Sequence, residues 1–142
     1  MKLSVFLGSL LCSAGIALAA EAPKISPADA DRLVREGKAV LVDCREPNEW
    51  KETGVAAPAV LLAKSDFDGD QTQWKEFLAR NKGKQILVYC RSGRRSGIIA
   101  NTLAEKDVKA ANVGGLKDWT DAGLPTRTVD APKSEAKPAP KK

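Results

Sequence analysis

Residues 85–96 read QILVYCRSGRRS, and this segment gives the clearest indication of the fold of the chain. The run 85–90 is continuously apolar, which is typical of a parallel strand covered on both of its faces. A short loop rich in arginine, serine and glycine follows, and residues 96–106 then carry apolar side chains at helical spacing. A buried strand, a tight loop and a helix in this order predict one unit of an α/β fold.

Strand-like and helix-like segments alternate on both sides of this unit, which favours an α/β fold with a mainly parallel sheet. Ser26 and Pro27 form an N-cap and first-turn pair that opens a helix, and Gly37 follows its end. Further strands are expected at 39–44, 59–62 and 108–113, and helices at 26–36, 71–81 and 116–122.

Residues 1–20 have the pattern of a cleavable signal peptide, with Lys2 ahead of an apolar stretch and small residues up to Ala20. A membrane anchor fits less well, because the apolar run is shorter than the roughly 20 residues of a span and is interrupted by small polar residues. A lipoprotein anchor at Cys12 fits less well too, since Leu11 precedes it. We therefore expect export, and a periplasmic location if the source is a Gram-negative bacterium.

The other end, residues 127–142, is rich in Lys, Pro and Ala and is expected to be a disordered tail. The tail carries much of the chain's formal net charge of +5, and residues 21–126 are nearly neutral. Because the 21–126 segment shows no basic stripe interleaved with aromatic residues, the charge does not indicate a nucleic-acid-binding protein. The length of the 21–126 segment fits a single domain.

Chemistry is restricted by the complete absence of histidine. Serine and cysteine mechanisms that need a histidine base are excluded, as are histidine-ligated metal sites. Cys90 then stands out, because it ends the strand just where the loop begins. Inward-pointing loop amides and a helix N-terminus form an anion cradle, which lowers the pKa of a thiol. We therefore predict that Cys90 is a thiolate at neutral pH.

Roles follow for the rest of the loop. Arg91 and Arg94 are suited to an anionic ligand, and Arg95 either joins them or pairs internally. Gly93 permits a backbone conformation that a side chain would hinder, and Ser96 is expected to cap the helix. The predicted substrate-binding set is Arg91, Ser92, Gly93, Arg94, Arg95 and Ser96.

Three segments, in this order, resemble the rhodanese family of sulfurtransferases. They are LVDCREPNEW ending at Trp50, the loop CRSGRRS at 90–96, and GGLKDWTDAGLP at 114–125. The resemblance covers residues 26–126 and implies a rhodanese-like α/β fold, roughly a five-stranded parallel sheet with helices on both faces. It also implies a persulfide on Cys90, with Asp43 and Arg45 in support and with no cofactor and no metal.

The chain departs from the family pattern in two places. Where the family has Gly-His-Ile-Pro-Gly-Ala, residues 54–59 read GVAAPA, and the histidine is lost. Cys44 stands where an aliphatic residue is usual. We weigh it as a core filler, a resolving thiol or one half of a structural disulfide with Cys90.

The expected function is transfer of a sulfane sulfur from thiosulfate or a related anionic donor to cyanide or a thiol. Related phosphatases place five residues between cysteine and arginine, whereas Arg95 leaves only four after Cys90. A noncatalytic module that binds an anion or a partner protein is one alternative, and a thiol-redox protein using Cys44 and Cys90 is another. The sequence leaves the oligomeric state open.

Overall fold

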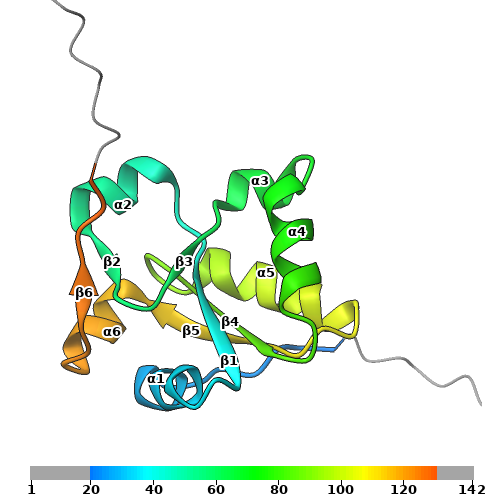
Figure 1. The fold of residues 1–142 in the computed structure, drawn as a ribbon, viewed down its shortest axis with the longest axis horizontal. Helices are drawn as coiled ribbons and strands as arrows, with labels where there is room; N and C mark the ends of the chain where they lie inside the picture. Colours follow the sequence, from blue (N-terminus) through cyan, green and yellow to red (C-terminus); the bar gives the residue numbers. More distant parts are fainter. Residues whose placement is uncertain (1–19, 131–142) are drawn as a thin grey trace, which may run out of the picture.

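The computed structural model describes residues 20–130, so the expected leader and most of the expected tail lie outside the described residues. A parallel sheet runs through the centre in the order β3-β1-β4-β5, and Figure 1 shows it between two groups of helices. Its strands are β1 (Ala39–Asp43), β3 (Val60–Leu61), β4 (Gln85–Cys90) and β5 (Ala110–Gly115). The α/β fold predicted from the sequence is therefore confirmed.

The expected fifth strand is reduced to one bridge at the β5 edge of the sheet. Lys24 pairs in parallel with Asn112, whose backbone exchanges hydrogen bonds with Pro23 and Ile25 at 2.9 and 3.0 Å. The pairing stops there because Pro23 has no N–H to donate and Pro27 begins a helix. The sheet thus has four strands and one bridged residue rather than five strands.

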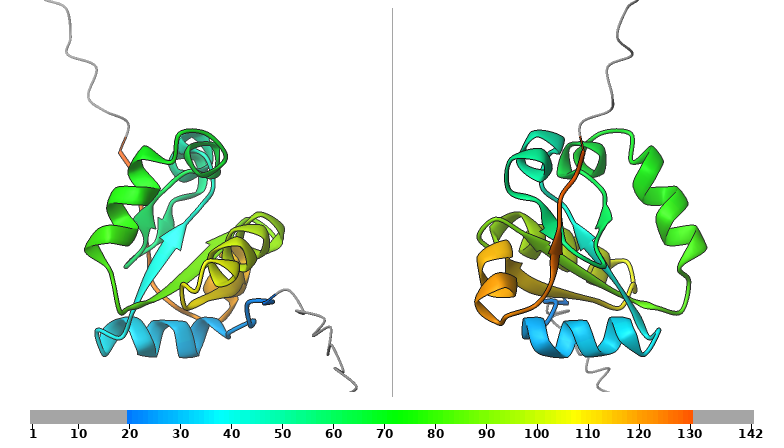
Figure 2. Two further views of the ribbon diagram at one scale, coloured as in Figure 1. Left: turned by 90° about the vertical axis from the view of Figure 1, so that its right-hand side faces the viewer. Right: turned by 60° about the vertical axis from the view of Figure 1, so that its left-hand side comes forward.

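Helices cover both faces of the sheet, as the two views of Figure 2 show. One face is covered by α1 (Pro27–Arg35) and α6 (Leu116–Asp121), and the other by α3 (Lys64–Asp68), α4 (Thr72–Arg80) and α5 (Arg94–Glu105). Within residues 20–130, no helix is both long and apolar enough to cross a membrane.

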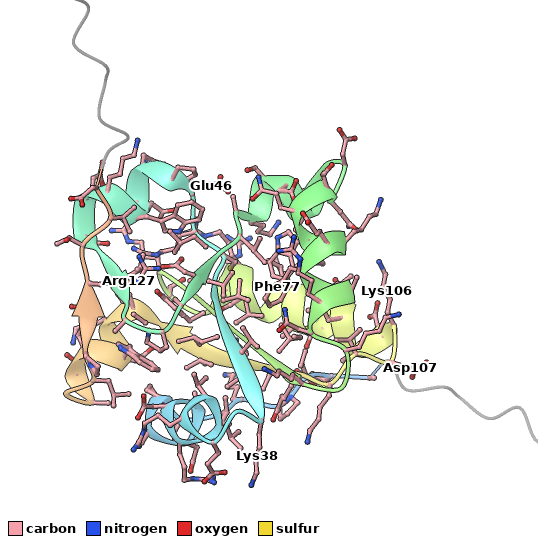
Figure 3. The ribbon with its side chains drawn as sticks, in the orientation of Figure 1. Lys38, Glu46, Phe77, Lys106, Asp107 and Arg127 are labelled. Atoms are coloured by element: carbon pink, nitrogen blue, oxygen red, sulfur yellow. The ribbon has the colours of Figure 1, made fainter. Side chains whose placement is uncertain are left out.

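Alternation along the strands divides the core into two layers. Val42 and Val88 pack toward α3, α4 and α5, whereas Leu41 and Leu87 pack toward α1 and α6. Phe77, labelled in Figure 3, extends from α4 toward the strands. Each large apolar side chain buried in this way contributes about 1.5 to 3 kcal/mol, so the sheet is a rigid base for the loops at its carboxyl edge.

Short elements that the sequence did not predict surround this edge. They are the helix α2 (Pro47–Thr53) and an antiparallel ribbon of β2 (Val55–Ala56) with β6 (Thr126–Arg127). Arg127, which the sequence assigned to the tail, pairs with Val55 and donates to the carbonyls of Ala57 and Ala59 at 3.2 and 2.9 Å. Arg127 is therefore part of the β2–β6 ribbon, contrary to its assignment to the tail.

Candidate active site

The turn between β4 and α5 is shaped by glycine. Gly93 is the residue before the helix and has φ +89°, a left-handed conformation that L side chains rarely adopt. A Cβ at Gly93 would also lie 3.2 Å from the Cα of Gly114 near the end of the neighbouring strand β5. Both facts let the chain turn directly from Cys90 into α5, so the loop amides face the sulfur.

Cys90 lies at the bottom of this turn and has no exposed surface. The Gly93 amide donates to its sulfur at 3.1 Å, and the Ser96 hydroxyl lies 3.4 Å from the same atom. A hydrogen bond from Cys44 is the largest stabilising influence on the thiolate; the Ser96 hydroxyl and the Ser92 and Ser96 amides add to it. Together they outweigh the cost of burial and lower the pKa of Cys90 to about 4.

Cys44 follows β1 and lies beside Cys90 in the same layer of the core, also with no exposed surface. Its proton is held by the hydrogen bond to Cys90, by burial and by the negative charges of Cys90 and Asp43, all of which raise the pKa of Cys44. Both cysteines are free thiols in this structure, without the structural disulfide that the sequence left open.

Ser96 does not cap the helix as expected. Because Gly93 starts the turn early, α5 begins at Arg94 and Ser96 lies inside its first turn, fully buried. Its hydroxyl lies 2.8 Å from Asn112 Oδ1 in addition to its contact with Cys90. Ser96 therefore connects the thiolate to the neighbouring strand rather than closing the helix end.

Asn112 on β5 was not predicted from the sequence, yet it fixes the loop. Its Oδ1 also accepts from the Gly114 amide at 3.0 Å, and its Nδ2 donates to the Gly93 carbonyl at 2.9 Å. It is nearly buried, at 9% exposure. One amide side chain thus holds the loop after Cys90 against the carboxyl end of β5, which preorganises the cradle.

The loop arginines divide into two kinds. Arg95 donates to both carboxylate oxygens of Glu49 on α2 at 2.7 Å, and this pairing lowers the pKa of Glu49 to about 2 and raises that of Arg95. Arg91 and Arg94 are exposed and pair with no acidic side chain among residues 20–130. The structure thus leaves Arg91, Arg94 and the exposed Ser92 for a ligand, while Arg95 ties α5 to α2.

Asp43 and Arg45 form a buried ion pair at the end of β1. Arg45 Nη2 donates to Asp43 Oδ2 at 2.7 Å and to the Gly54 carbonyl at 2.7 Å, and Nη1 donates to Thr53 Oγ1 at 2.7 Å. These bonds hold α2 and the residues after it against the sheet. The pair supports the site through α2, which carries Glu49, and does not itself contact Cys90.

Glu46, labelled in Figure 3 between α2 and α3, is the residue before α2. Its carboxylate accepts from the Ser65 hydroxyl at 2.8 Å and the Ser65 amide at 3.1 Å. Its own backbone N–H donates to Glu49 at 2.9 Å. Glu46 therefore links the first turns of α2 and α3 and leaves the loop arginines to other partners.

Surface hollows border the loop on several sides. A hollow of about 490 Å³ reaches Arg91, one of about 430 Å³ reaches Arg94 and Arg95, and one of about 470 Å³ reaches Ser92 and Arg94. Cys90 lines none of these hollows, so a small movement of the loop has to precede any contact with its sulfur. The free guanidinium groups at these hollows suit a small anion.

Several known proteins are similar in sequence to this chain. Residues 26–122 match the family described as "Rhodanese-like domain". An uncharacterized protein of Synechocystis sp. is 34% identical over 111 residues, which cover 76% of this chain and 58% of that protein. A putative mitochondrial thiosulfate sulfurtransferase of Schizosaccharomyces pombe is 30% identical over 94 residues, covering 58% of this chain and 63% of that protein. The chain thus spans about three fifths of the length of either relative.

Among solved structures, a protein of unknown function from Rhodopseudomonas palustris, described as a possible tyrosine phosphatase, superimposes with a TM-score of 0.62. It is 26% identical, and the match covers 75% of this chain and 85% of that one. The order of strands, the cysteine at the end of β4 and the family match lead to one conclusion: this chain belongs to the rhodanese-like family, which includes sulfurtransferases.

Proposed function

We propose that this protein is a sulfurtransferase that carries a sulfane sulfur on Cys90 as a persulfide, with thiosulfate or a related anion as donor. The observation that carries the proposal is the environment of the Cys90 sulfur. A hydrogen bond from Cys44, with the Ser96 hydroxyl and the Ser92 and Ser96 amides, lowers the pKa of this thiol to about 4, and the Gly93 amide also donates to the sulfur at 3.1 Å. A thiol with this pKa is a nucleophile at neutral pH without any base, which a chain without histidine requires.

In the first half-reaction, the Cys90 thiolate attacks the outer sulfur of thiosulfate. The new bond joins Cys90 Sγ to that sulfur, the S–S bond of the donor breaks, and sulfite leaves with the electron pair. Arg91 and Arg94 bind the donor's oxygens, because their charges are not used elsewhere among residues 20–130. The loop amides then stabilise the negative charge on the outer sulfur of the persulfide.

In the second half-reaction, a thiophilic acceptor attacks the outer sulfur and returns Cys90 to the thiolate. Cyanide serves as acceptor in an assay, giving thiocyanate, and a thiol serves in the cell. Two successive displacements on one sulfur predict ping-pong kinetics. We place this reaction outside the cytoplasm, on the strength of the leader pattern in residues 1–20.

Phosphatase chemistry is the weaker candidate, although one structural relative carries that description. Only four residues separate Cys90 from Arg95, and Arg95 is already paired with Glu49 through two hydrogen bonds of 2.7 Å. A phosphoryl group needs a wider cradle and a guanidinium free to bind its oxygens. The narrow loop favours a single sulfur atom.

Intact-mass measurement tests the proposal. The reduced protein treated with thiosulfate is expected to gain one sulfur atom, which cyanide then removes as thiocyanate. Cys90→Ser should gain none, while Cys44→Ser, the matched change at the neighbouring cysteine, should still gain it. If neither the wild-type protein nor Cys44→Ser, both folded and reduced, gains sulfur, the proposal is contradicted and a noncatalytic anion-binding or partner-binding module is favoured.

A further inference from the structure

Cys44, the residue after β1, and Cys90, the last residue of β4, occupy facing positions. The parallel pairing of β1 with β4 stays in register through Asp43 and Tyr89, and the Cys44 amide donates to the Tyr89 carbonyl at 3.1 Å. The next pair in this register is Cys44 and Cys90, and both side chains belong to the same core layer. Parallel neighbours lie about 4.8 Å apart, within the Cα separation of about 4.4 to 6.8 Å that disulfides span.

This arrangement gives Cys44 an access to the reactive sulfur that no outside molecule has. Both cysteines have no exposed surface, and the hollows around the loop stop short of Cys90. An external acceptor must first move the loop, whereas Cys44 already lies beside the sulfur. A valine would fill the same apolar position, so filling the core does not require a thiol.

We propose that Cys44 is a resolving thiol that attacks the persulfide at Cys90 Sγ, closes a Cys44–Cys90 disulfide and releases the outer sulfur as hydrosulfide. This inference rests on the proposed function, since it starts from the persulfide. The bond that forms joins the two cysteine sulfurs, and the bond that breaks is the S–S bond of the persulfide. The electron pair of the broken S–S bond and the proton of Cys44 leave with the outer sulfur, so the two cysteines end up oxidised to a disulfide and the sulfane sulfur is reduced.

The order of events follows from the charges around the pair. Before loading, the Cys90 thiolate and Asp43 hold the proton on Cys44, while Arg95 opposes them from α5. Loading moves the negative charge from Cys90 Sγ to the outer sulfur, which removes the strongest of these influences. Burial still opposes ionisation of Cys44 after loading, so its proton passes to the departing outer sulfur as the disulfide forms, and the attack by Cys44 follows formation of the persulfide.

A dithiol is the reductant that returns the enzyme to its starting state. It reduces the Cys44–Cys90 disulfide by thiol–disulfide exchange and becomes a disulfide itself. Over the whole cycle, thiosulfate and a dithiol give sulfite, hydrosulfide, a disulfide and a proton. The protein would thus be a thiosulfate reductase whenever a dithiol replaces the sulfur acceptor.

The test follows the loaded protein after excess thiosulfate has been removed under anaerobic conditions. In the wild type, the sulfur adduct should be replaced by a species two hydrogens lighter than the reduced protein, with one equivalent of hydrosulfide released. Both cysteines should become resistant to alkylation, and peptide mapping should find Cys44 joined to Cys90. In Cys44→Ser, the adduct should persist at least about tenfold longer, because a hydroxyl cannot close the disulfide.

Cys44→Ala serves as a second variant in case the serine disturbs the buried layer, and Val42→Ala is the matched control. Val42 is buried on the same face of β1, so its truncation loosens the packing while it keeps the thiol. The Val42→Ala protein should therefore resolve its persulfide at the wild-type rate. The lifetime of the sulfur adduct is measured from the end of loading, so a difference between the proteins in the rate of loading does not affect the comparison.

The outcomes separate the two proposals. Loading in all the proteins with equal adduct lifetimes, or hydrosulfide release without a disulfide, would overturn the role of Cys44 and leave sulfur transfer intact. Failure of the wild type and of both Cys44 variants to load at all would instead contradict sulfur transfer itself, and the role of Cys44 would fall with it.

Discussion

The ends of β1 and β4 lie side by side at one edge of the sheet and use their charges in opposite ways. At the end of β1, Arg45 is 2% exposed and its guanidinium is shared among Asp43, Thr53 and Gly54. At the end of β4, Arg91 and Arg94 are exposed, and neither pairs with an acidic side chain within residues 20–130.

Arginines follow both strands, so the presence of positive charge at a strand end does not by itself identify a binding site. The positive charge after β1 is fully used in holding α2 in place, so removing it costs stability. The positive charges of Arg91 and Arg94 lie on the loop that follows Cys90 and pair with no acidic side chain within residues 20–130, so we expect their removal to weaken ligand binding. Substitutions at the two strand ends should therefore fail in different ways.

The largest effect is expected at the sulfur itself. Cys90→Ser should lower thiocyanate formation from thiosulfate and cyanide by at least about a thousandfold, because a hydroxyl at neutral pH is not ionised and cannot carry sulfur. Its unfolding midpoint should stay close to that of the wild type. Appreciable turnover by a folded Cys90→Ser protein would show that the chemistry lies elsewhere.

Next in size is the loss of the buried charge after β1. Arg45→Met should lower the free energy of unfolding by about 3 to 5 kcal/mol, since Asp43 would remain buried and unpaired. Urea denaturation measures this loss. Asp43→Asn combined with Arg45→Met should lose less than Arg45→Met alone, and a double variant that is worse than the single one would contradict the account of this pair.

At the end of β4, single substitutions of the free arginines should act on binding alone. Arg91→Ala and Arg94→Ala should each raise the KM for thiosulfate by about tenfold, as expected when one charge-assisted hydrogen bond is lost. Their free energies of unfolding should stay within about 0.5 kcal/mol of the wild type. Unchanged KM values together with a large loss of stability would reverse the contrast between the two strand ends.

The smallest effect concerns the pair that joins the two regions. The pKa of Glu49 is about 2 in the folded protein, below its ordinary 4.5, so the stability it contributes is complete above pH 4.5 and is lost as the pH falls toward 2. Glu49→Gln should remove about 1 kcal/mol at neutral pH and flatten the acid side of the stability profile. Glu52→Gln, an exposed change on the same helix, should leave that profile unaltered.

Local signals were sufficient to predict the frame of the fold. The continuous apolar run of 85–90 predicted β4. The lowered pKa of Cys90 was also predicted, but its largest cause is the hydrogen bond from Cys44 and not the arginines of the loop. The short helices α2 and α3 were not predicted, because they span only 7 and 5 residues and show too little hydrophobic periodicity. The bridge at Lys24 likewise falls short of a strand, because of the prolines around it.

Within the site, what could not be predicted depends on contacts between distant residues. Asn112 lies 19 positions from Gly93 in the sequence, and Glu49 lies 46 positions from Arg95. No local sequence pattern therefore predicts either contact. The capping signature of Glu46 and Glu49 could have shown α2, though not that Glu49 also binds α5. The role of Ser96 was misread because the helix start depends on the backbone angle of Gly93, which the residue type permits without requiring.

The central claim is that Cys44 and the loop together keep Cys90 as a thiolate, and the pH dependence of its alkylation by iodoacetamide tests this most directly. The rate should rise with a midpoint near pH 4 and stay level through neutrality, because the pKa of Cys90 is lowered to about 4. In Cys44→Ser the midpoint should move upward, since the Cys44 thiol is the largest stabilising neighbour. A midpoint close to the ordinary thiol value of 9.0 in the wild type would contradict the account.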